Sequence, residues 1–368
     1  MADPAAHILA ANHTGITRPY FSDVFLPAFG EAEARLPAVE KHYRVAGQSV
    51  RLRFFGDDVR VRLAPAFAHL ERTDVADGTG VAPVAGTGEP GLTIALWDSA
   101  SSGVTFPPPW SDPSYSFGIH SAVFPSAGDG FRGAWLGERE GMAFYDPSSK
   151  TAHFWTPNAR QIPPWVPAAP LRPILHWFLS AQDVHLIHGA VVGAGGKAAL
   201  LTAKSGSGKS TTSLTCLLEG LDFLGDDYVA VGSAEPVTAY SLYATAKVLP
   251  ERMPDFADLR EYAWDTQGEK TVLFLADARP DQLHASMPLA AILIPVITHA
   301  ERTTVVPARK QDALLALLPT TLMQLPLAGT DKAGRLAHII ARTPCHFLRL
   351  GRDPREAARA VKAFLETV

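Results

Sequence analysis

Residues 198–211 read AALLTAKSGSGKST, and this stretch decides how the second half of the chain folds. Its first four residues have the length and composition of a short buried strand. Residues 203–210 follow the pattern G-x-x-x-x-G-K-[ST], except that Ala203 stands at the first glycine. Residues 210–218 then read as a helix with three leucines on one face. A strand that leads through a glycine-rich loop into a helix is the context that a phosphate-binding loop requires.

This loop offers the groups that hold a phosphate chain. Glycines let backbone N–H groups come close to the phosphates, and the helix N-terminus adds positive potential. In loops of this pattern the lysine reaches the β- and γ-phosphates and the next hydroxyl binds Mg²⁺. We therefore expect ATP and Mg²⁺ as cofactors. The predicted cofactor-binding residues are Lys204, Ser205, Gly206, Ser207, Gly208, Lys209, Ser210 and Thr211.

Ala203 is the one departure from the loop pattern. Alanine can replace the first glycine only if the backbone at this position does not need a positive φ. The alternative interpretation is a glycine turn between a strand and a helix, with no ligand. The order of strand, loop and helix favours the phosphate-binding interpretation.

Two adjacent acids follow the helix. Asp226 and Asp227 stand between the apolar runs 221–224 and 228–231. Neighbouring side chains on a strand point to opposite faces, so two acids at a strand end can have different roles. One would bind Mg²⁺ and the other would accept a proton, as transfer to a hydroxyl requires. We expect Asp227 to bind the metal with Ser210, while the sequence leaves open which acid is the base. The alternative is a solvated turn.

A histidine and two lysines complete the candidate site. His188 precedes the loop strand, and His185 lies three positions earlier. An odd spacing on a strand sends the two rings to opposite faces, so at most one of them faces the site. Lys247 and Lys270 follow the acids and are candidates for binding the transferred phosphate or a substrate carboxylate, with an ordinary surface lysine as the alternative. Cys216 lies inside the helix without an adjacent base, which favours packing.

Three motifs agree in order and spacing with a known family. The runs HGAV from His188, AKSGSGKSTT from Ala203 and FLGDDYVAV from Phe223 resemble the catalytic core of the HPr kinase/phosphorylase family and, more distantly, of phosphoenolpyruvate carboxykinases. The resemblance is strong over residues 185–232. It implies that His188, Lys209 and the paired acids surround ATP and a divalent metal, and that the core phosphorylates a serine hydroxyl. It therefore nominates His188, Lys209, Asp226 and Asp227 as catalytic residues.

Two departures bear on the substrate. The C-terminal half has nothing like the glycine-rich signature that bifunctional members use for phosphorolysis, and the N-terminal region does not resemble theirs. HPr is therefore not the expected substrate. The layout is similar to HPr-kinase-related proteins of peptide biosynthesis clusters, among them lasso-peptide kinases, which phosphorylate the terminal serine of a precursor.

Three functions follow from these patterns. The leading hypothesis is an ATP-dependent kinase that phosphorylates a serine of a peptide or small protein, such as the C-terminal serine of a lasso-peptide precursor. A kinase for a free amino acid or another small molecule is the second. The third is a non-catalytic protein in which ATP orders a partner surface, against which the intact acid pair argues.

The length of 368 residues predicts two domains, since single cores stop growing near roughly 250–300 residues. Short apolar runs that alternate with glycine- and proline-rich loops make the N-terminal part β-rich, and Tyr43 to Phe54 has the alternation of a hairpin around Ala46 and Gly47. Prolines over residues 157–173 exclude a continuous helix or a central strand. We expect an α/β protein: a smaller β-rich α+β domain over residues 1–160, possible site of substrate binding, and an HPr-kinase-like P-loop domain with a mixed sheet over residues 161–368.

Composition limits the partners. The chain has 33 Lys and Arg against 37 Asp and Glu, so no basic excess favours nucleic acid. Two cysteines are too few for a disulfide framework and fit a reducing cytoplasm. No run approaches the roughly 18 apolar residues of a membrane span. A peptide or small protein is the expected partner, and the sequence leaves a homo-oligomer open.

Overall fold

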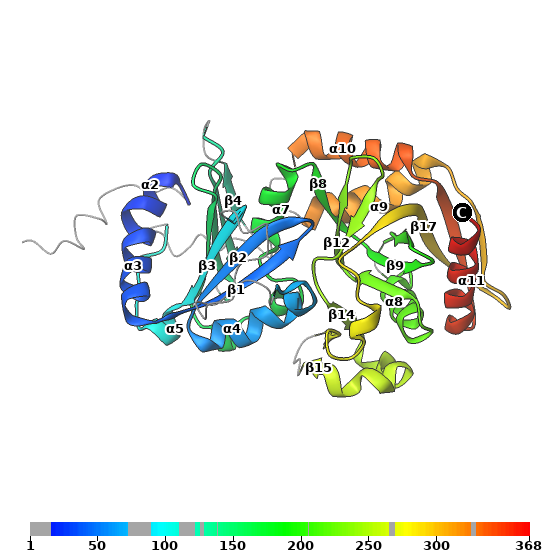
Figure 1. Ribbon diagram of the computed structural model, residues 1–368, viewed down its shortest axis with the longest axis horizontal. Coiled ribbons are helices and arrows are strands. Elements are labelled where there is room, and N and C mark those ends of the chain that lie inside the picture. The colour runs from blue at the N-terminus through cyan, green and yellow to red at the C-terminus, as the bar shows by residue number, and fades with distance from the viewer. Residues whose placement is uncertain are drawn as a thin grey trace, which may run out of the picture.

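The computed structural model describes residues 16–72, 90–109, 122–125, 129–137, 139–204, 206–264, 269–324 and 329–368. Ser205 of the predicted loop lies outside these ranges. The described residues form two large sheets and a small one, with helices between and around them (Figure 1). The fold is therefore of the mixed α/β kind that the sequence predicts.

The first sheet has seven strands in the order β1-β2-β3-β7-β6-β5-β4. The pairs β2–β3 and β3–β7 are parallel, and the other pairs are antiparallel. The predicted hairpin is confirmed, because Val45 pairs with Gln48 across Ala46 and Gly47, both at positive φ. The strands are β1 (Ala38–Val45), β2 (Gln48–Phe55), β3 (Leu92–Asp98), β4 (Ala122–Pro125), β5 (Arg132–Gly137), β6 (Gly141–Asp146) and β7 (Thr151–Thr156).

An aromatic cluster covers one face of this sheet. It is carried by α2 (Arg18–Tyr20), the π-helix η1 (Phe21–Phe25) and α3 (Leu26–Arg35). Phe25 and Phe29 contact Trp97 of β3, and Phe25 also contacts Phe144 of β6. Burying rings of this size is a large hydrophobic contribution to the stability of the sheet.

The other face packs against helices that lie between the two large sheets. These are α4 (Asp57–Leu63), η2 (Ala64–Leu70), η3 (Ala159–Gln161), α6 (Trp165–Ala168) and α7 (Arg172–Ser180), while α5 (Ser99–Ser102) follows β3. One buried core joins Ile94 of the first sheet, Leu175 of α7 and Leu186 of the second sheet. Helix α7 is therefore fixed between the sheets. The proline-rich stretch 157–173 forms only short helices until α7 begins, as predicted.

The second sheet has nine strands, in the order β11-β9-β10-β17-β13-β12-β8 with β19 beside β17 and β18 beside β19. The pairs β10–β17 and β17–β19 are parallel. A small antiparallel sheet has the order β14-β16-β15. The strands are β8 (Val184–His188), β9 (Ala190–Ala194), β10 (Lys197–Leu201), β11 (Asp222–Gly225), β12 (Tyr228–Gly232), β13 (Thr238–Tyr240), β14 (Thr245–Val248), β15 (Ala263–Trp264), β16 (Thr271–Phe274), β17 (Ser286–Ala300), β18 (Thr304–Pro307) and β19 (Cys345–Gly351).

One apolar run long enough for a single strand forms two strands. The apolar run 186–192 forms two strands that break at Gly189, and β8 pairs with β12 whereas β9 pairs with β10 and β11. A Cβ atom at Gly189 would lie 2.8 Å from the carbonyl oxygen of Leu201. The chain can cross β10 this closely only without a side chain, so it changes partners at the glycine.

Helices cover both faces of the second sheet. On one face, α8 (Lys209–Leu218) and α11 (Pro354–Thr367) share a core with β9 and β10. On the other, α9 (Lys310–Gln324) and α10 (Gly329–Arg342) share a core with β12 and β17. The N-terminus of α11 is capped by Asp353, whose carboxylate accepts a hydrogen bond from the Arg355 backbone N–H at 2.9 Å. The remaining 3₁₀ helices are η4 (Pro250–Tyr262) and η5 (Pro280–Gln282).

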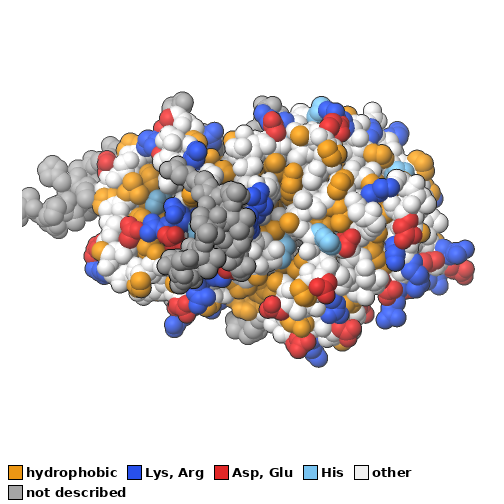
Figure 2. All heavy atoms as spheres, viewed as in Figure 1, with side chains coloured by type: hydrophobic (Ala, Val, Ile, Leu, Met, Phe, Trp, Pro, Cys, Tyr) orange, Lys and Arg blue, Asp and Glu red, His pale blue; other side chains and the backbone are white. Residues whose placement is uncertain are grey.

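The two large sheets are formed by successive parts of the chain, but the domain boundary near residue 160 stays a prediction. The first sheet ends with β7, and the second begins with β8 beyond α7. Side chains of both charge signs are interspersed among apolar ones on the face in Figure 2. Within the described ranges, every helix is too short or too polar to cross a membrane.

Candidate functional site

The glycine-rich loop connects β10 to α8, as predicted. Gly206 and Gly208 have φ of +79° and +89°, a conformation that glycine adopts without penalty. Ala203 is not among the residues with positive φ, so its side chain is compatible with the first position of the loop. A Cβ atom at Gly206 would meet nothing within 4 Å, and the buried Ser207 hydroxyl has no partner among the described residues. The loop thus has space and a free hydroxyl for a ligand.

Lys209 folds back over its own loop. Its ammonium donates to the carbonyl oxygens of Ala203 at 2.6 Å and Lys204 at 3.2 Å, and its side chain is buried. Burial lowers the pKa of Lys209, while the charges of Asp226 and Asp227 act against this shift. Oxygen atoms therefore surround the ammonium, which is the environment that phosphate oxygens would provide. The Lys204 side chain is exposed.

A tight bend at the end of β11 presents the two acids. Gly225 has a φ of +155°, and a Cβ atom there would lie 2.9 Å from Val229 Cγ1. Asp227 has a φ of +69°, which is uncommon for a residue with a side chain. The backbone N–H of Tyr228 closes the bend by donating to the carbonyl oxygen of Asp226 at 2.8 Å. Backbone strain of this kind clusters at functional sites, and here it separates the two carboxylates.

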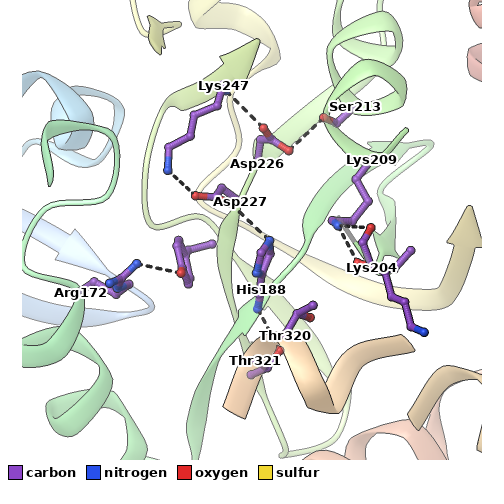
Figure 3. Close-up of polar contacts among 12 residues, drawn as sticks. Arg172, His188, Lys204, Lys209, Ser213, Asp226, Asp227, Lys247, Thr320 and Thr321 are labelled. Atoms are coloured by element: carbon purple, nitrogen blue, oxygen red, sulfur yellow. Dashed lines mark hydrogen bonds and ion pairs between the residues drawn. The ribbon is translucent and has the colours of Figure 1, made fainter. Parts of the chain in front are cut away.

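The two carboxylates have different partners (Figure 3). Asp226 Oδ1 accepts from the Ser213 hydroxyl at 3.4 Å, and Asp226 Oδ2 accepts from the Lys247 backbone N–H at 3.4 Å. The Ser210 side chain is near enough to act on the pKa of Asp226, which it lowers. Asp227 instead pairs through Oδ2 with Lys247 Nζ at 2.7 Å and lies through Oδ1 3.4 Å from His188 Nε2. One acid therefore faces the start of α8, and the other faces the lysine and the histidine.

These surroundings move the two pKa values in opposite directions. Burial, together with the charge of Asp227, raises the pKa of Asp226 to about 6. Burial also acts to raise the pKa of Asp227, but the charges of Lys247 and His188 outweigh it and lower this pKa to about 2. At neutral pH the pair thus holds one firmly ionised carboxylate and one that protonates readily.

His188 ends β8 opposite Tyr228 in the pairing with β12. Its backbone N–H donates to the Thr321 hydroxyl of α9 at 3.1 Å, and its ring lies 5.5 Å from the Tyr228 ring. His185 is buried in the core instead, so only one of the two histidines reaches the acids. Helix α9 therefore takes part in positioning His188.

Most of the residues that the sequence predicts come together here, with one exception. Lys247 lies between the two acids, whereas Lys270 is exposed and influences Lys209 only through its charge. Ser210 and Thr211 are half-buried at the start of α8. The roles of these residues stay predictions. The Ser210 side chain acts on the pKa of Asp226, and its predicted pairing with Asp227 as metal ligands stays a prediction.

The sequence analysis missed several residues that contact the site. They are Arg172, Ser213, Tyr228 and Thr321: Ser213 bonds to Asp226, Thr321 bonds to His188, and Arg172 bonds to Tyr228, which pairs with His188. Of these residues, only Ser213 and Tyr228 could have been found from the sequence, because they lie in or next to the motifs. The described residues contain no group of three or more His, Cys, Asp or Glu that could hold a metal. A metal here would need Ser210, the acids and oxygen atoms of a bound phosphate chain.

Comparisons with known proteins add little to this geometry. No protein-family model matches the chain, and no curated protein matches it. A solved structure to which it is similar is the HPr(Ser) kinase/phosphatase from Coxiella burnetii, with 13% sequence identity and a TM-score of 0.30. The match covers 50% of this chain and 97% of that chain. A likeness of this degree carries no conclusion about activity, which is argued below from the site.

Proposed function

We propose that the protein transfers the γ-phosphate of ATP to a hydroxyl group, and that the acceptor is a serine of a peptide or small protein. One observation supports this most: Asp227 lies in contact with His188 and Lys247, and both Asp226 and Asp227 are close enough to the loop lysine Lys209 for their charges to act on its pKa. Positioning and charge stabilisation are most of what phosphoryl transfer needs from a protein.

The donor side of the site would be the loop and the start of α8. Lys209 would exchange its two carbonyl partners for oxygens of the β- and γ-phosphates. Bound Mg²⁺, held by the Ser210 hydroxyl and Asp226, would offset negative charge on the phosphates. Asp226 accepts a hydrogen bond from Ser213 of α8 and lies near Ser210, which favours this acid as the metal ligand over Asp227.

In the reaction, the acceptor oxygen forms a bond to the γ-phosphorus as the bond from that phosphorus to the β–γ bridging oxygen breaks, and ADP leaves. The hydroxyl proton passes to a carboxylate. Asp227 suits this role by position, because its side chain is 24% exposed and faces His188 rather than α8. The ion pair with Lys247 keeps its pKa at about 2. A phosphoryl group that draws Lys247 away would raise that pKa and make Asp227 a better base.

The acceptor is the least constrained part of the proposal. The layout of the chain, which is similar to HPr-kinase-related proteins of peptide biosynthesis clusters, suggests a C-terminal serine, as in a lasso-peptide precursor. Incubation with γ-labelled ATP, Mg²⁺ and three acceptors tests it: a precursor peptide that ends in serine, HPr, and free serine. We expect label on the peptide. Label on free serine alone would instead favour a small-molecule kinase.

Two variants make the assay specific. Asp227→Asn removes the proposed base and should abolish transfer while ATP still binds. Asp222→Asn is the matched control on β11, because this acid is half-buried and pairs with His284 at 3.0 Å away from the loop. ATP binding with no acceptor labelled by the unmodified protein would contradict the proposal and favour an ATP-sensing role.

A further inference from the structure

An arginine of α7 lies next to the acid pair. Arg172 Nη1 donates to the Tyr228 hydroxyl at 2.8 Å, and the guanidinium carbon lies 4.8 Å from the centre of the Tyr228 ring. Tyr228 follows Asp227 directly, and its ring contacts His188. Stacking on an aromatic ring fixes the plane of a guanidinium group. Arg172 is therefore an oriented cation at the edge of the site.

Within the described part of the chain, the charge of Arg172 has no carboxylate partner. Among the residues that the structure describes, it forms no ion pair, and its buried Nε atom has no hydrogen-bond acceptor. Asp227 feels this charge but pairs with Lys247. Glu140 is the other nearby acid; burial raises its pKa, and its carboxylate accepts from the Trp165 indole at 2.8 Å rather than from Arg172. The guanidinium thus remains available to an anion from outside the chain.

The backbone before Arg172 is held in place by buried hydrogen bonds. The Thr245 hydroxyl donates to the carbonyl oxygen of Ala168 at 2.6 Å, and the Tyr243 hydroxyl donates to that of Pro170 at 2.9 Å. Leu171, which is 3% exposed, has a φ of +58°. A side-chain-bearing residue in this region costs about 1 kcal/mol, and such conformations persist where packing enforces them. Thr245 is the first residue of β14, the strand that carries Lys247. Its hydrogen bond therefore connects the backbone before Arg172 to the strand of the second cation.

Arg172 lies on the side of the acids that is away from the loop. Figure 3 shows Asp226, Asp227 and His188 between Lys209 on one side and Arg172 on the other. The charge of Arg172 acts on Asp227, and Lys209 interacts with the charges of both acids. In phosphoryl transfer the attacking and leaving oxygens lie roughly in line, so the acceptor enters opposite the donor. Arg172 is therefore on the acceptor side.

We infer that Arg172 binds a carboxylate of the acceptor and thereby selects acceptors whose carboxylate lies next to the reacting hydroxyl. This inference rests on the proposed phosphoryl transfer. A guanidinium group binds a planar carboxylate through two parallel hydrogen bonds, which gives orientation as well as affinity. With the carboxylate on Arg172, the neighbouring hydroxyl is held towards Asp227. A serine at the C-terminus of a peptide has this chemistry, whereas a serine inside a peptide does not.

Two small probes isolate the carboxylate. N-acetyl-L-serine mimics a C-terminal serine, and N-acetyl-L-serinamide differs from it only by lacking the charge. Calorimetry in the presence of Mg²⁺ and ADP measures their binding to the unmodified protein, to Arg172→Gln and to Arg172→Lys. Arg359→Gln is the matched control, because Arg359 lies on α11 and pairs with Asp353 on the surface. Thermal unfolding checks that each variant folds.

We expect the unmodified protein and Arg359→Gln to bind the acid at least about tenfold more tightly than the amide, since a hydrogen-bonded charge contributes about 1.5–3 kcal/mol. Arg172→Gln should bind the two probes equally, and Arg172→Lys should recover part of the difference. Equal binding or no binding of the probes by the unmodified protein, or a preference that survives in Arg172→Gln, would overturn the inference.

Kinetics with labelled ATP separates this inference from the function on which it rests. Arg172→Gln should raise the KM for N-acetyl-L-serine and leave the KM for ATP unchanged. A rise in the KM for ATP instead would assign Arg172 to the phosphate chain and overturn the inference. If the protein binds N-acetyl-L-serine more tightly than the amide but transfers phosphate to no acceptor, the proposed kinase function would be contradicted. The carboxylate site at Arg172 would still be supported.

Discussion

Lys247 Nζ lies 2.7 Å from Asp227 Oδ2, and the backbone N–H of the same lysine donates to Asp226 Oδ2 at 3.4 Å. A single residue of β14 thus contacts both acids, although its ammonium group forms an ion pair with only one of them. This explains why two adjacent carboxylates coexist at the end of one strand. The ammonium keeps Asp227 ionised, and Asp226, buried beside that negative charge, has a raised pKa.

The ion pair between Asp227 and Lys247 should show strong coupling in a double-mutant cycle. Asp227→Asn and Lys247→Met each leave a half-buried charge without its partner, and each should lower the free energy of unfolding by about 1–3 kcal/mol. The double variant should lose less than the sum, with a coupling energy of about 1–3 kcal/mol. Urea unfolding at pH 7 measures all four proteins.

Asp226→Asn is the matched variant for this cycle. It replaces a buried carboxylate that lacks an ionic partner of its own, so the free energy of unfolding should change by less than in Asp227→Asn or should rise. Additive losses in the cycle, or a larger loss in Asp226→Asn, would show that Lys247 does not stabilise Asp227.

Two neighbouring threonines of α9 should differ in their effect on His188. The Thr321 hydroxyl accepts from the backbone N–H of His188, whereas the Thr320 hydroxyl only returns to the carbonyl oxygen of Leu317 in its own helix. Thr321→Val should lower the free energy of unfolding by about 1–2 kcal/mol, because a buried N–H loses its acceptor. Phosphate transfer should fall with it. Thr320→Val should change both quantities little, and equal effects of the two would contradict the assigned role of Thr321.

The parts of the site that sequence could predict are those in which neighbours in the chain are neighbours in space. The loop, α8 and the acid pair are such parts, because each depends on a few consecutive residues. Arg172 was missed because it reaches Tyr228 from a helix 56 positions away, and the proline-rich stretch 157–173 that contains it was interpreted only as excluding a continuous helix or a central strand. Thr321 is 133 positions from His188. Such contacts depend on how helices pack on the sheet, which local patterns do not encode.

The break between β8 and β9 had a local signal that the sequence analysis did not use. Gly189 interrupts the apolar run, and a glycine inside a strand often marks a close approach of another backbone. The apolar residues on both sides belong to buried strands of one sheet, so hydrophobicity alone reads them as continuous. The glycine therefore carried more information about topology than the apolar residues around it.

Gly189→Ala should disturb the site that this break creates. The new Cβ atom would lie 2.8 Å from the carbonyl oxygen of Leu201 and 2.9 Å from Leu200 Cδ1, so β8 or β10 must shift. We expect a loss of about 1–3 kcal/mol in the free energy of unfolding and weaker ATP binding, since β10 leads into the loop. Gly334→Ala in α10 is the control: nothing lies within 4 Å of its Cβ position, so stability should rise by about 0.5–1 kcal/mol. Unchanged stability of Gly189→Ala would contradict the close approach.

The buried ammonium group of Lys332 on α10 should lower the free energy of unfolding at neutral pH. Its side chain is 4% exposed, and its ammonium has no partner among the residues that the structure describes. Burial lowers its pKa from the ordinary value of 10.5 to about 7. Between these values the unfolded chain binds more protons than the folded one, so stability should rise with pH, by up to about 1.4 kcal/mol per pH unit. The stability gained at higher pH is lost again as the pH falls towards 7.

Lys332→Met removes this penalty and the pH dependence together. At pH 7 the variant should be more stable than the unmodified protein, and the difference should shrink as pH rises to about 9.5, since the deprotonated lysine is neutral in the folded state. His176 is buried nearby and has a pKa of about 3, so it is already neutral throughout this range and does not contribute to the slope. Urea unfolding at pH 7, 8 and 9.5 measures the difference, with Lys362→Met on the exposed side of α11 as the control. A difference that stays constant over these pH values would mean that Lys332 has an anionic partner and remains charged in the folded protein.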